Sequence, residues 1–212
     1  MPEVSVIIVT LKQERNIKSL SALSRRDFND FEVIVRDDEG ISKARNEGIK
    51  RSSADKIVFL DDDAIPEDGF LTAASNVLEN HKVVAGRVIH PTDDAFKQFN
   101  TNVNLGTRKQ NINTIRGCNM GFRREVFEDV GYFDEDFDWG HDEIELRDRV
   151  LDAGYDILYS PEMSVQHPYC ESRREYWRKQ YLKGISDIRY WDKREIPVSK
   201  RIAKMIHPRL YV

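Results

Sequence analysis

Three consecutive aspartates, Asp61, Asp62 and Asp63, are the residues of this chain whose type and spacing point most clearly to chemistry. They follow the apolar run 57–60, which is short and partly β-branched and therefore predicts a buried strand. Adjacent like charges repel one another and are costly to bury unpaired, so a cation is expected to neutralise them. Hard carboxylate oxygens suit Mg²⁺ or Mn²⁺, and such an ion could hold a diphosphate. The alternative is a solvated acidic turn, because residues 64–69 continue as a loop.

A second acidic cluster ends at Asp142 and Glu143, the first residues of a helix predicted over 142–153. The helix dipole stabilises the charged form of carboxylates at that end. General-base chemistry on a hydroxyl needs an ionised carboxylate that can be reached from a cleft, although plain helix-start acidity would give the same pattern. His167 is a further candidate: a lone histidine is usually structural, but imidazole is also a common metal ligand. The segment 116–121 is rich in glycine and asparagine, which is typical either of backbone close to a ligand or of an ordinary turn.

The elements that must position these residues can be predicted from the spacing of apolar side chains. The predicted strands cover 4–10, 31–35, 57–60 and 83–90, with shorter extended pieces at 155–159 and 164–167 on either side of Pro161. The predicted helices cover 16–23, 42–51, 70–80, 124–130 and 142–153, and 93–110 is expected to be a loop or flap.

Strands and helices that alternate with short connections indicate an α/β fold with a parallel sheet covered by helices. In such sheets, ligands bind at the carboxyl ends of the strands. The first three predicted strands end at Thr10, at Asp37 with Asp38, and at the aspartate triplet. These polar tips are therefore expected to converge on one edge of the sheet.

The bulk composition indicates a globular protein with an uneven charge distribution. The 212 residues, 40% apolar and 33% charged, suffice for one sizeable core or for one domain with an appendage. The net charge of -4 gives no global reason to expect a nucleic-acid partner. From Glu171 onward, 12 Lys/Arg against 5 Asp/Glu give a local charge of +7, which leaves -11 for the first 170 residues. This asymmetry favours an acidic catalytic body and a basic tail suited to an anionic surface.

Cysteine usage and the apolar runs bear on localisation. Cys118 and Cys170 form neither a disulfide framework nor a metal-binding spacing, which favours a reducing compartment. Residues 1–5 lead directly into a strand without the pattern of a secretory signal, and no apolar run reaches about 18 residues. The expected localisation is cytoplasmic, with peripheral contact to the inner face of a membrane as an option.

That option rests on a basic helical tail predicted over 171–212, in which aromatic and aliphatic residues interleave with cations. Such a helix can lie in a membrane interface, with its rings at headgroup depth and its cations on anionic lipid. The alternative is a helix that packs its aromatic residues onto the catalytic body or a partner subunit. The apolar residues concerned are Tyr176, Trp177, Tyr181, Ile185, Ile188, Tyr190 and Trp191.

Taken in order, these motifs resemble the family 2 glycosyltransferases, inverting enzymes with the nucleotide-sugar-binding GT-A fold. The resemblance covers residues 3–168 and rests on VSVIIVT, FEVIVRDD, ISKARNEGI followed by IVFLDDDAIP, and the long segment from GCNMGF to SVQHP. It implies a GT-A-like, Rossmann-related sheet, mostly parallel and flanked by helices. Residues 1–170 would form the transferase domain, with a nucleotide-sugar and metal half over about 1–90 and an acceptor and catalytic-base half over about 91–170.

The resemblance also implies a metal site. Asp61 and Asp63 match the ends of the family's DXD motif, and Asp63 would ligate Mn²⁺ or Mg²⁺. Asp61 would contact the nucleotide ribose or the metal shell. His167 matches a histidine that completes the metal site in related enzymes.

The same resemblance assigns nucleotide-binding and catalytic residues. Asp38 would bind the base of the nucleotide, Thr10 would line the same pocket, and Arg45 would lie beside the donor. Asp142 and Glu143 occupy the family's Glu-Asp pair, which holds the catalytic base. The pair is inverted here, so residue type favours Asp142 as the base and register favours Glu143.

A second departure concerns the nucleotide pocket. Only three residues, 39–41, separate Asp38 from Ser42, where the family usually has a helix and an edge strand. The pocket is therefore expected to be more open.

The function that these observations imply is metal-dependent, inverting transfer of a sugar from a nucleoside-diphosphate sugar to a hydroxyl of a glycan or a lipid-linked acceptor. One alternative is a sugar-phosphate nucleotidyltransferase, which normally carries a glycine-rich phosphate loop after the first strand; residues 11–15 contain no glycine. Another alternative is a non-catalytic nucleotide-sugar-binding or scaffold protein. The acidic residues present at every position expected from the resemblance argue against it.

Overall fold

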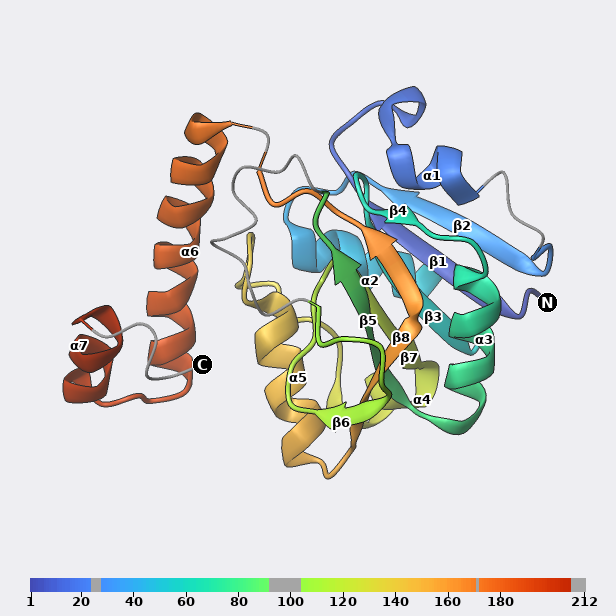
Figure 1. Ribbon diagram of the computed structural model, residues 1–212. Helices are drawn as coiled ribbons and strands as arrows, with labels where there is room; N and C mark the ends of the chain where they lie inside the picture. Colours follow the sequence, from blue (N-terminus) through green and yellow to red (C-terminus); the bar gives the residue numbers. More distant parts are fainter. Residues whose placement is uncertain (24–27, 92–103, 171, 207–212) are drawn as a thin grey trace.

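The computed structural model describes residues 1–23, 28–91, 104–170 and 172–206. Within these residues one mixed sheet forms the centre of the molecule, with helices on both of its faces (Figure 1). The strands are β1 Val4–Val9, β2 Phe31–Arg36, β3 Lys56–Asp61, β4 Ile65–Pro66, β5 Val83–Ile89, β6 Gln110–Ile112, β7 Asn119–Arg123 and β8 Ile157–Gln166. The helices are the short 3-10 turn η1 Glu14–Asn16, then α1 Lys18–Leu23, α2 Ile41–Arg51, α3 Phe70–Asn80, α4 Arg124–Val130, α5 Asp142–Asp152, α6 Arg173–Lys193 and α7 Val198–Ile206.

The strand order is β2-β1-β3-β7-β5-β8-β4, and β6 pairs with β8 outside this path. β1 runs parallel to β2 and β3, and β5 runs parallel to β8. β7 lies between these two groups and is antiparallel to both β3 and β5. The predicted α/β class with flanking helices is confirmed, but the sheet is more mixed than the mostly parallel one expected from the sequence.

The difference comes from β7, which occupies the segment expected to be a turn or a ligand loop. Its sequence, Asn-Met-Gly-Phe-Arg, contains no β-branched residue, so the strand is decided by packing. The Asn119 amide donates to the carbonyls of Arg87 and Met163, at 3.0 and 2.9 Å. Gly86 faces this amide, where a Cβ would lie 2.3 Å from Nδ2 of Asn119. Tertiary contacts of this kind leave little trace in local sequence patterns.

The two faces of the sheet carry separate apolar cores, because successive side chains of a strand point in opposite directions. Val6 and Ile8 of β1 join the core under α1 and α3, where Phe70 is buried. Ile7 points the other way and joins the core under α2, α4 and α5, together with Phe127. Full burial of each such side chain stabilises the fold by ~1.5–3 kcal/mol.

β8 carries the chain back to the edge at which β3 ends. Its ladder with β5 pairs Gly86 with Ser160 and then Arg87 with Ser164, so residues 161–163 bulge out of register. Proline cannot donate to the ladder, which explains the interruption at Pro161. The two extended pieces predicted on either side of Pro161 are thus one interrupted strand, whose end places the next residue, His167, beside the aspartate triplet.

The tail forms α6, which stands beside the body, and α7, which folds back against the C-terminal end of α6 (Figure 1). Arg201 of α7 makes this contact through Asp192, at 2.5 Å. None of the helices in the described part of the chain is both long and apolar enough to cross a bilayer. Most of the flap predicted over 93–110 lies outside the described residues, and its last residue begins β6.

Candidate active site

The three aspartates at the end of β3 do not share one environment. Asp61 and Asp63 both approach Nε2 of His167, through Oδ2 at 3.5 Å and Oδ1 at 2.9 Å respectively. Asp62 instead accepts a hydrogen bond from the Thr10 hydroxyl and pairs with Nζ of Lys12 at 2.7 Å. The triplet therefore divides into an outer pair that faces a histidine and a central acid that the protein neutralises by itself.

The outer pair requires positive charge. Burial alone would raise the pKa of Asp63, but the hydrogen bond and charge of His167 outweigh burial and lower this pKa to about 2. Burial also disfavours the charged imidazole, yet hydrogen bonds and attraction to Asp61 and Asp63 raise the pKa of His167 to about 9. A protonated imidazole thus lies where two carboxylates need a cation. These residues fit a divalent ion, which would take over this role and displace the imidazole proton.

Cys118 is a member of this cluster that the sequence did not reveal. Its Sγ, a carboxylate oxygen of Asp61 and a ring nitrogen of His167 all lie within 4.8 Å of one another. Burial, and then the charge of Asp61, raise the pKa of the thiol well above its usual value. The cysteines show no metal-binding spacing in the sequence, and this absence was misleading. The three ligand atoms come from separate segments of the chain and are brought together only by the fold.

Arg45 of α2 connects this cluster to the second acidic site. Its side chain is 3% exposed; Nη1 pairs with Asp142, and Nη2 lies 3.8 Å from Oδ1 of Asp61. The guanidinium also lies over the ring of Phe133, 5.4 Å from its centroid. Gly117 leaves the space it needs, because a Cβ there would lie 2.5 Å from Nη2. One buried cation is thus shared between two carboxylates that the sequence places far apart.

Asp142 and Glu143 differ sharply in their surroundings. Asp142 is 1% exposed, and Arg45 holds its Oδ2. Burial raises the pKa of Asp142 to about 7; the attraction of Arg45 opposes this shift and the charge of Glu143 adds to it. Glu143, the next residue of α5, is partly exposed. The structure therefore offers one buried, paired carboxylate and one that remains accessible.

Side chains of α2 hold the loop before α5, residues 131–141, in place. Asn46 donates to the carbonyl of Phe133 and accepts from its backbone N–H, both at 2.9 Å. The hydroxyl of Ser42 donates to the carbonyl of Phe137 at 2.8 Å. Buried polar groups that pair with backbone in this way stabilise one loop conformation. The ISKARNEG motif therefore contributes Arg45 to the site and also anchors the loop before α5.

Side chains of α6 hold the same loop through its last residues, 139–141. Nε2 of His141 lies 2.8 Å from Oδ1 of Asp187, and His141 has a left-handed backbone with φ of 65° directly before α5. The hydroxyl of Ser186 donates to the carbonyl of Trp139. The predicted tail is thus in direct contact with the segment that positions Asp142.

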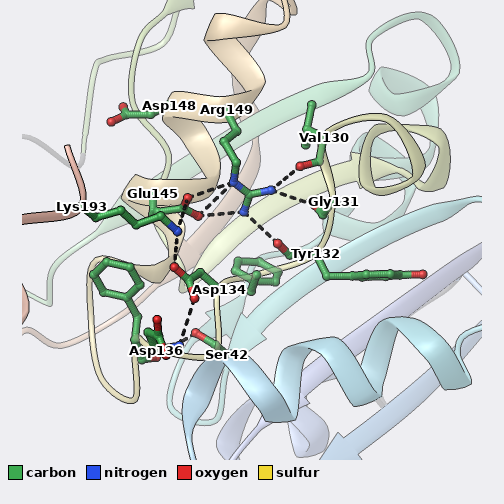
Figure 2. A network of polar contacts seen from close by, with 12 residues as sticks. Ser42, Val130, Gly131, Tyr132, Asp134, Asp136, Glu145, Asp148, Arg149 and Lys193 are labelled. Atoms are coloured by element: carbon green, nitrogen blue, oxygen red, sulfur yellow. Dashed lines mark hydrogen bonds and ion pairs between the residues drawn. The ribbon is translucent and has the colours of Figure 1, made fainter. Parts of the chain in front are cut away.

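Further along, α6 joins an ionic network around α5 (Figure 2). Lys193 bridges Asp134 and Glu145, the latter at 3.1 Å. Glu145 also pairs with Arg149 at 2.7 Å. The guanidinium of Arg149 donates to three successive carbonyls, those of Val130, Gly131 and Tyr132.

A pocket of about 470 Å³ opens between α6 and this loop. Its lining includes Asp136, Asp138 and Arg189 but none of Asp61, Asp63 or His167. We regard the pocket as a feature of the helix docking, because its charged lining belongs to α6 and the loop before α5, whereas the cluster of Asp61, Asp63 and His167 lies elsewhere.

The residues predicted to bind nucleotide are only partly brought together. Thr10 lies beside the triplet, although its hydroxyl is engaged by Asp62. Asp38, just after β2, accepts from Nε and Nη2 of Arg36 at 2.8 and 2.7 Å. Within the described part of the chain, Asp38 makes no hydrogen bond or ion pair with Asp61, Asp63 or His167.

Comparison with known proteins decides the family. The model of glycosyl transferase family 2 matches residues 18–131, more than half of the chain. The chain belongs to this family. A second model, described as the N-terminal domain of galactosyltransferase, matches residues 97–174.

Relatives and solved structures agree with this assignment. The chain is 26% identical over 195 residues to glycosyltransferase AglE of Haloferax volcanii, covering 88% of this chain and 63% of that protein. It is 25% identical over 196 residues to the glucosyl-dolichyl phosphate glucuronosyltransferase of the same organism, covering 77% and 62%. The transferase thus spans somewhat over three-fifths of the length of these relatives.

Two solved structures share the fold at low identity. Staphylococcus aureus TarS 1-349 in complex with UDP-GlcNAc has a TM-score of 0.64 and 18% identity over 83% of this chain and 61% of that one. The mannosyltransferase PcManGT from Pyrobaculum calidifontis in complex with GDP-Man and Mn²⁺ has a TM-score of 0.62 and 17% identity over 84% and 60%. This glycosyltransferase therefore has the GT-A fold.

Proposed function

We propose that this glycosyltransferase moves a sugar from a nucleoside-diphosphate sugar to an acceptor hydroxyl, with inversion and with Mn²⁺ or Mg²⁺ as cofactor. The observation that carries the proposal is the convergence of Asp61, Asp63 and His167 at a strand end, linked by buried Arg45 to Asp142 at the start of α5. A bound divalent ion would offset the charge that develops on the leaving nucleoside diphosphate. The solved relatives that hold UDP-GlcNAc, or GDP-Man with Mn²⁺, support this choice of donor and metal.

Within this proposal Glu143 is the catalytic base and Asp142 is a positioning residue. One oxygen of Asp142 is held by Arg45 and its side chain is 1% exposed, so it is poorly placed to reach an acceptor. Glu143 lies next to it in the first turn of α5 and is partly exposed. Glu143 would take the hydroxyl proton as the acceptor oxygen attacks the anomeric carbon from the face opposite the diphosphate.

The nucleotide would bind along the ends of β1, β2 and β3. Thr10, Asp38 and Asp61 stand at these ends, and Arg45 lies behind Asp61. Contact between Asp38 and the base would require its pair with Arg36 to loosen or to admit a third group, because both oxygens of Asp38 now accept from Arg36.

For the acceptor, we propose a lipid-linked hydroxyl presented at an anionic membrane surface. One face of α6 exposes Trp177, Tyr181 and Ile188, which are 69%, 70% and 51% accessible. In α7, Val198 and Ile202 are likewise 67% and 50% accessible. The alternative reading of the tail holds for its other aromatic residues: Trp191 is buried, and Tyr190 lies against the ring of His141 and donates to Asp148. The proposal therefore rests on the face that exposes Trp177, Tyr181 and Ile188, since the opposite face of α6 contacts the body.

Two further observations support this acceptor class. Arg174 and Arg178 lie within one turn of the exposed rings, so apolar and cationic groups occur together as an anionic lipid surface requires. The relative whose name includes a dolichyl phosphate supports a lipid-linked acceptor. The corresponding localisation is the cytoplasmic face of a membrane.

The test measures transfer from a panel of nucleotide sugars with Mn²⁺, with Mg²⁺ and with excess chelator, and compares polyprenyl-phosphate-linked with soluble glycan acceptors. We expect one donor to be used, only with metal. Asp63→Ala should lose metal-dependent donor binding and transfer, while Asp55→Ala, at the exposed opposite end of β3, should behave as wild type. Full transfer in chelator would contradict metal dependence. Donor binding without transfer to any acceptor would favour the non-catalytic alternative.

A further inference from the structure

We propose that a thiophilic ion such as Zn²⁺ or Cd²⁺ binds Cys118, Asp61 and His167. Such an ion would occupy the position of the catalytic ion and exclude it. The inference deepens the proposed function, on which its consequence for transfer rests. The binding itself concerns only the side chains of this chain.

The first step is geometric. The donor atoms of Asp61, Cys118 and His167 lie within 4.8 Å of one another. Around a tetrahedral zinc ion with bonds of about 2.0–2.3 Å, neighbouring ligand atoms stand roughly 3.3–3.8 Å apart. Side-chain rotations that draw these atoms together by about 1 Å would therefore complete three ligands of such a site. Asp63 contacts the same ring nitrogen of His167 at 2.9 Å but lies outside the group of three, so a further rotation of its side chain would make it the fourth ligand.

The second step is that the backbone of Cys118 is held in place. The next residue, Asn119, has no exposed surface and anchors the start of the central strand β7 through the carbonyls of Arg87 and Met163. The backbone N–H of Asn119 also donates to the carbonyl of Arg116 at 2.9 Å, which closes the turn that contains Cys118. The thiol is therefore presented from a rigid strand end.

The third step is the ligand chemistry. Mg²⁺ and Mn²⁺ prefer oxygen ligands and would leave Cys118 as a neutral thiol, whereas Zn²⁺ and Cd²⁺ favour thiolate. On binding such an ion, the sulfur loses its proton to solvent and forms a metal–sulfur bond; no electron is transferred. A four-coordinate site of this kind is closed and keeps no position for a donor diphosphate. Thiophilic ions would thus inhibit transfer in competition with Mn²⁺ through Cys118.

Co²⁺ provides a probe of thiolate ligation that does not depend on activity. The full-length, metal-free chain is titrated with Co²⁺, and the near-ultraviolet thiolate-to-cobalt absorption is recorded. We expect the band in wild type and in Cys170→Ser, because Cys170 is a buried cysteine outside this cluster. Cys118→Ser should lose the band, and Cys118→Ala serves as a second variant in case serine disturbs the turn.

Competition titrations complete the test. The affinity for Zn²⁺ should fall at least tenfold in Cys118→Ser and stay at the wild-type value in Cys170→Ser, with far-ultraviolet circular dichroism confirming that each variant is folded. A band that persists in both Cys118 variants, or an unchanged Zn²⁺ affinity, would overturn the inference. If the band behaves as expected but no nucleotide sugar supports transfer, the inference stands and the proposed function fails.

Discussion

The two acidic sites of this transferase are held in opposite ways. Asp61 and Asp63 belong to one strand end, and His167 follows a strand of the same sheet, so their positions depend on main-chain pairing. Asp142 stands at the start of a helix whose preceding loop is held by side chains of α2 and α6. The proposed metal side, Asp61, Asp63 and His167, is therefore part of the sheet. The proposed base side, Asp142 and Glu143, is instead held by contacts between elements that are distant in the sequence.

This difference implies that the two sides respond to different perturbations. Substitutions of Asp61, Asp63 or His167 should act on the affinity for metal and donor, because the proposed function makes these residues the metal ligands. Substitutions of the side chains that anchor the loop before α5, such as Asn46 of α2 or Asp187 of α6, should act on turnover, because they move the carboxylates at the start of α5 without touching the donor.

The strongest test compares Glu143→Gln with Asp142→Asn. If Glu143 is the base, Glu143→Gln should reduce turnover by roughly 10²- to 10⁴-fold, with the donor Kd nearly unchanged. Asp142→Asn should instead weaken folding, because it leaves Arg45, which is 3% exposed, without its closest counter-charge. Steady-state kinetics, donor titration and urea unfolding of both variants separate these roles. Equal losses of turnover at unchanged stability would contradict the assignment.

A pH titration of stability tests the metal side. The folded-state pKa of His167 is raised from 6.5 to about 9, so the metal-free protein gains stability from this group below pH 6.5 and loses it as pH rises towards 9. A shift of this size corresponds to at most about 3 kcal/mol. Urea unfolding in chelator at pH 6 and pH 9 should show the loss in wild type and a much smaller one in His167→Ala. Identical pH dependence in both proteins would show that the pairing with Asp61 and Asp63 is not formed in solution.

The contrast between the two sides also explains what the sequence could predict. The aspartate triplet, Asp142 and His167 were found because each sits at the end of a locally patterned element. The role of Cys118 and the strand β7 could not be found in this way, because they depend on packing between distant segments. The one local signal for this region was its richness in glycine over 116–121. The lack of a side chain at Gly117 leaves space for the guanidinium of Arg45.

The docking of the tail was hidden for a similar reason. The basic helical character of the tail was predictable from composition, and α6 confirms that the segment is helical. The face of α6 that contacts the body was not predictable, because Asp187 and Ser186 contact His141 and Trp139, about 46 residues earlier in the chain. Polar side chains of this kind give no apolar periodicity from which a buried face could be inferred.

A third prediction addresses this docking. Asp187→Asn removes the charge that pairs with His141, and charge-assisted hydrogen bonds of this kind contribute ~1.5–3 kcal/mol. We expect turnover to fall about tenfold, equivalent to about 1.4 kcal/mol, because His141 immediately precedes α5, which carries the proposed base Glu143. The donor Kd should not change. Asp192→Asn is the matched control on the same helix, since Asp192 contacts Arg201 of α7. A change in donor Kd with unchanged turnover would argue against a positioning role.

The smallest effect is expected at the face of α6 that points away from the body. Trp177, Tyr181 and Ile185 recur every four residues and so form one stripe along the helix. If this stripe rests in an anionic interface, the full-length chain should cosediment with vesicles containing phosphatidylserine or phosphatidylglycerol at about 0.1 M salt, where screening is moderate. Replacing both rings by alanine should lower the bound fraction. Arg178→Gln should weaken partitioning about fivefold, since each cation near such a surface contributes ~1 kcal/mol.

Tyr132→Ala is the control for the ring substitutions, because Tyr132 is an aromatic residue of the body that is 43% accessible. Loss of binding in the α6 variant alone would identify the stripe as the contact. If the full-length chain stays in the supernatant with anionic and neutral vesicles alike, the membrane proposal is wrong. A concentration-dependent dimer that the α6 substitutions dissolve would then show that the stripe is a subunit interface, and a soluble glycan would become the better acceptor to test.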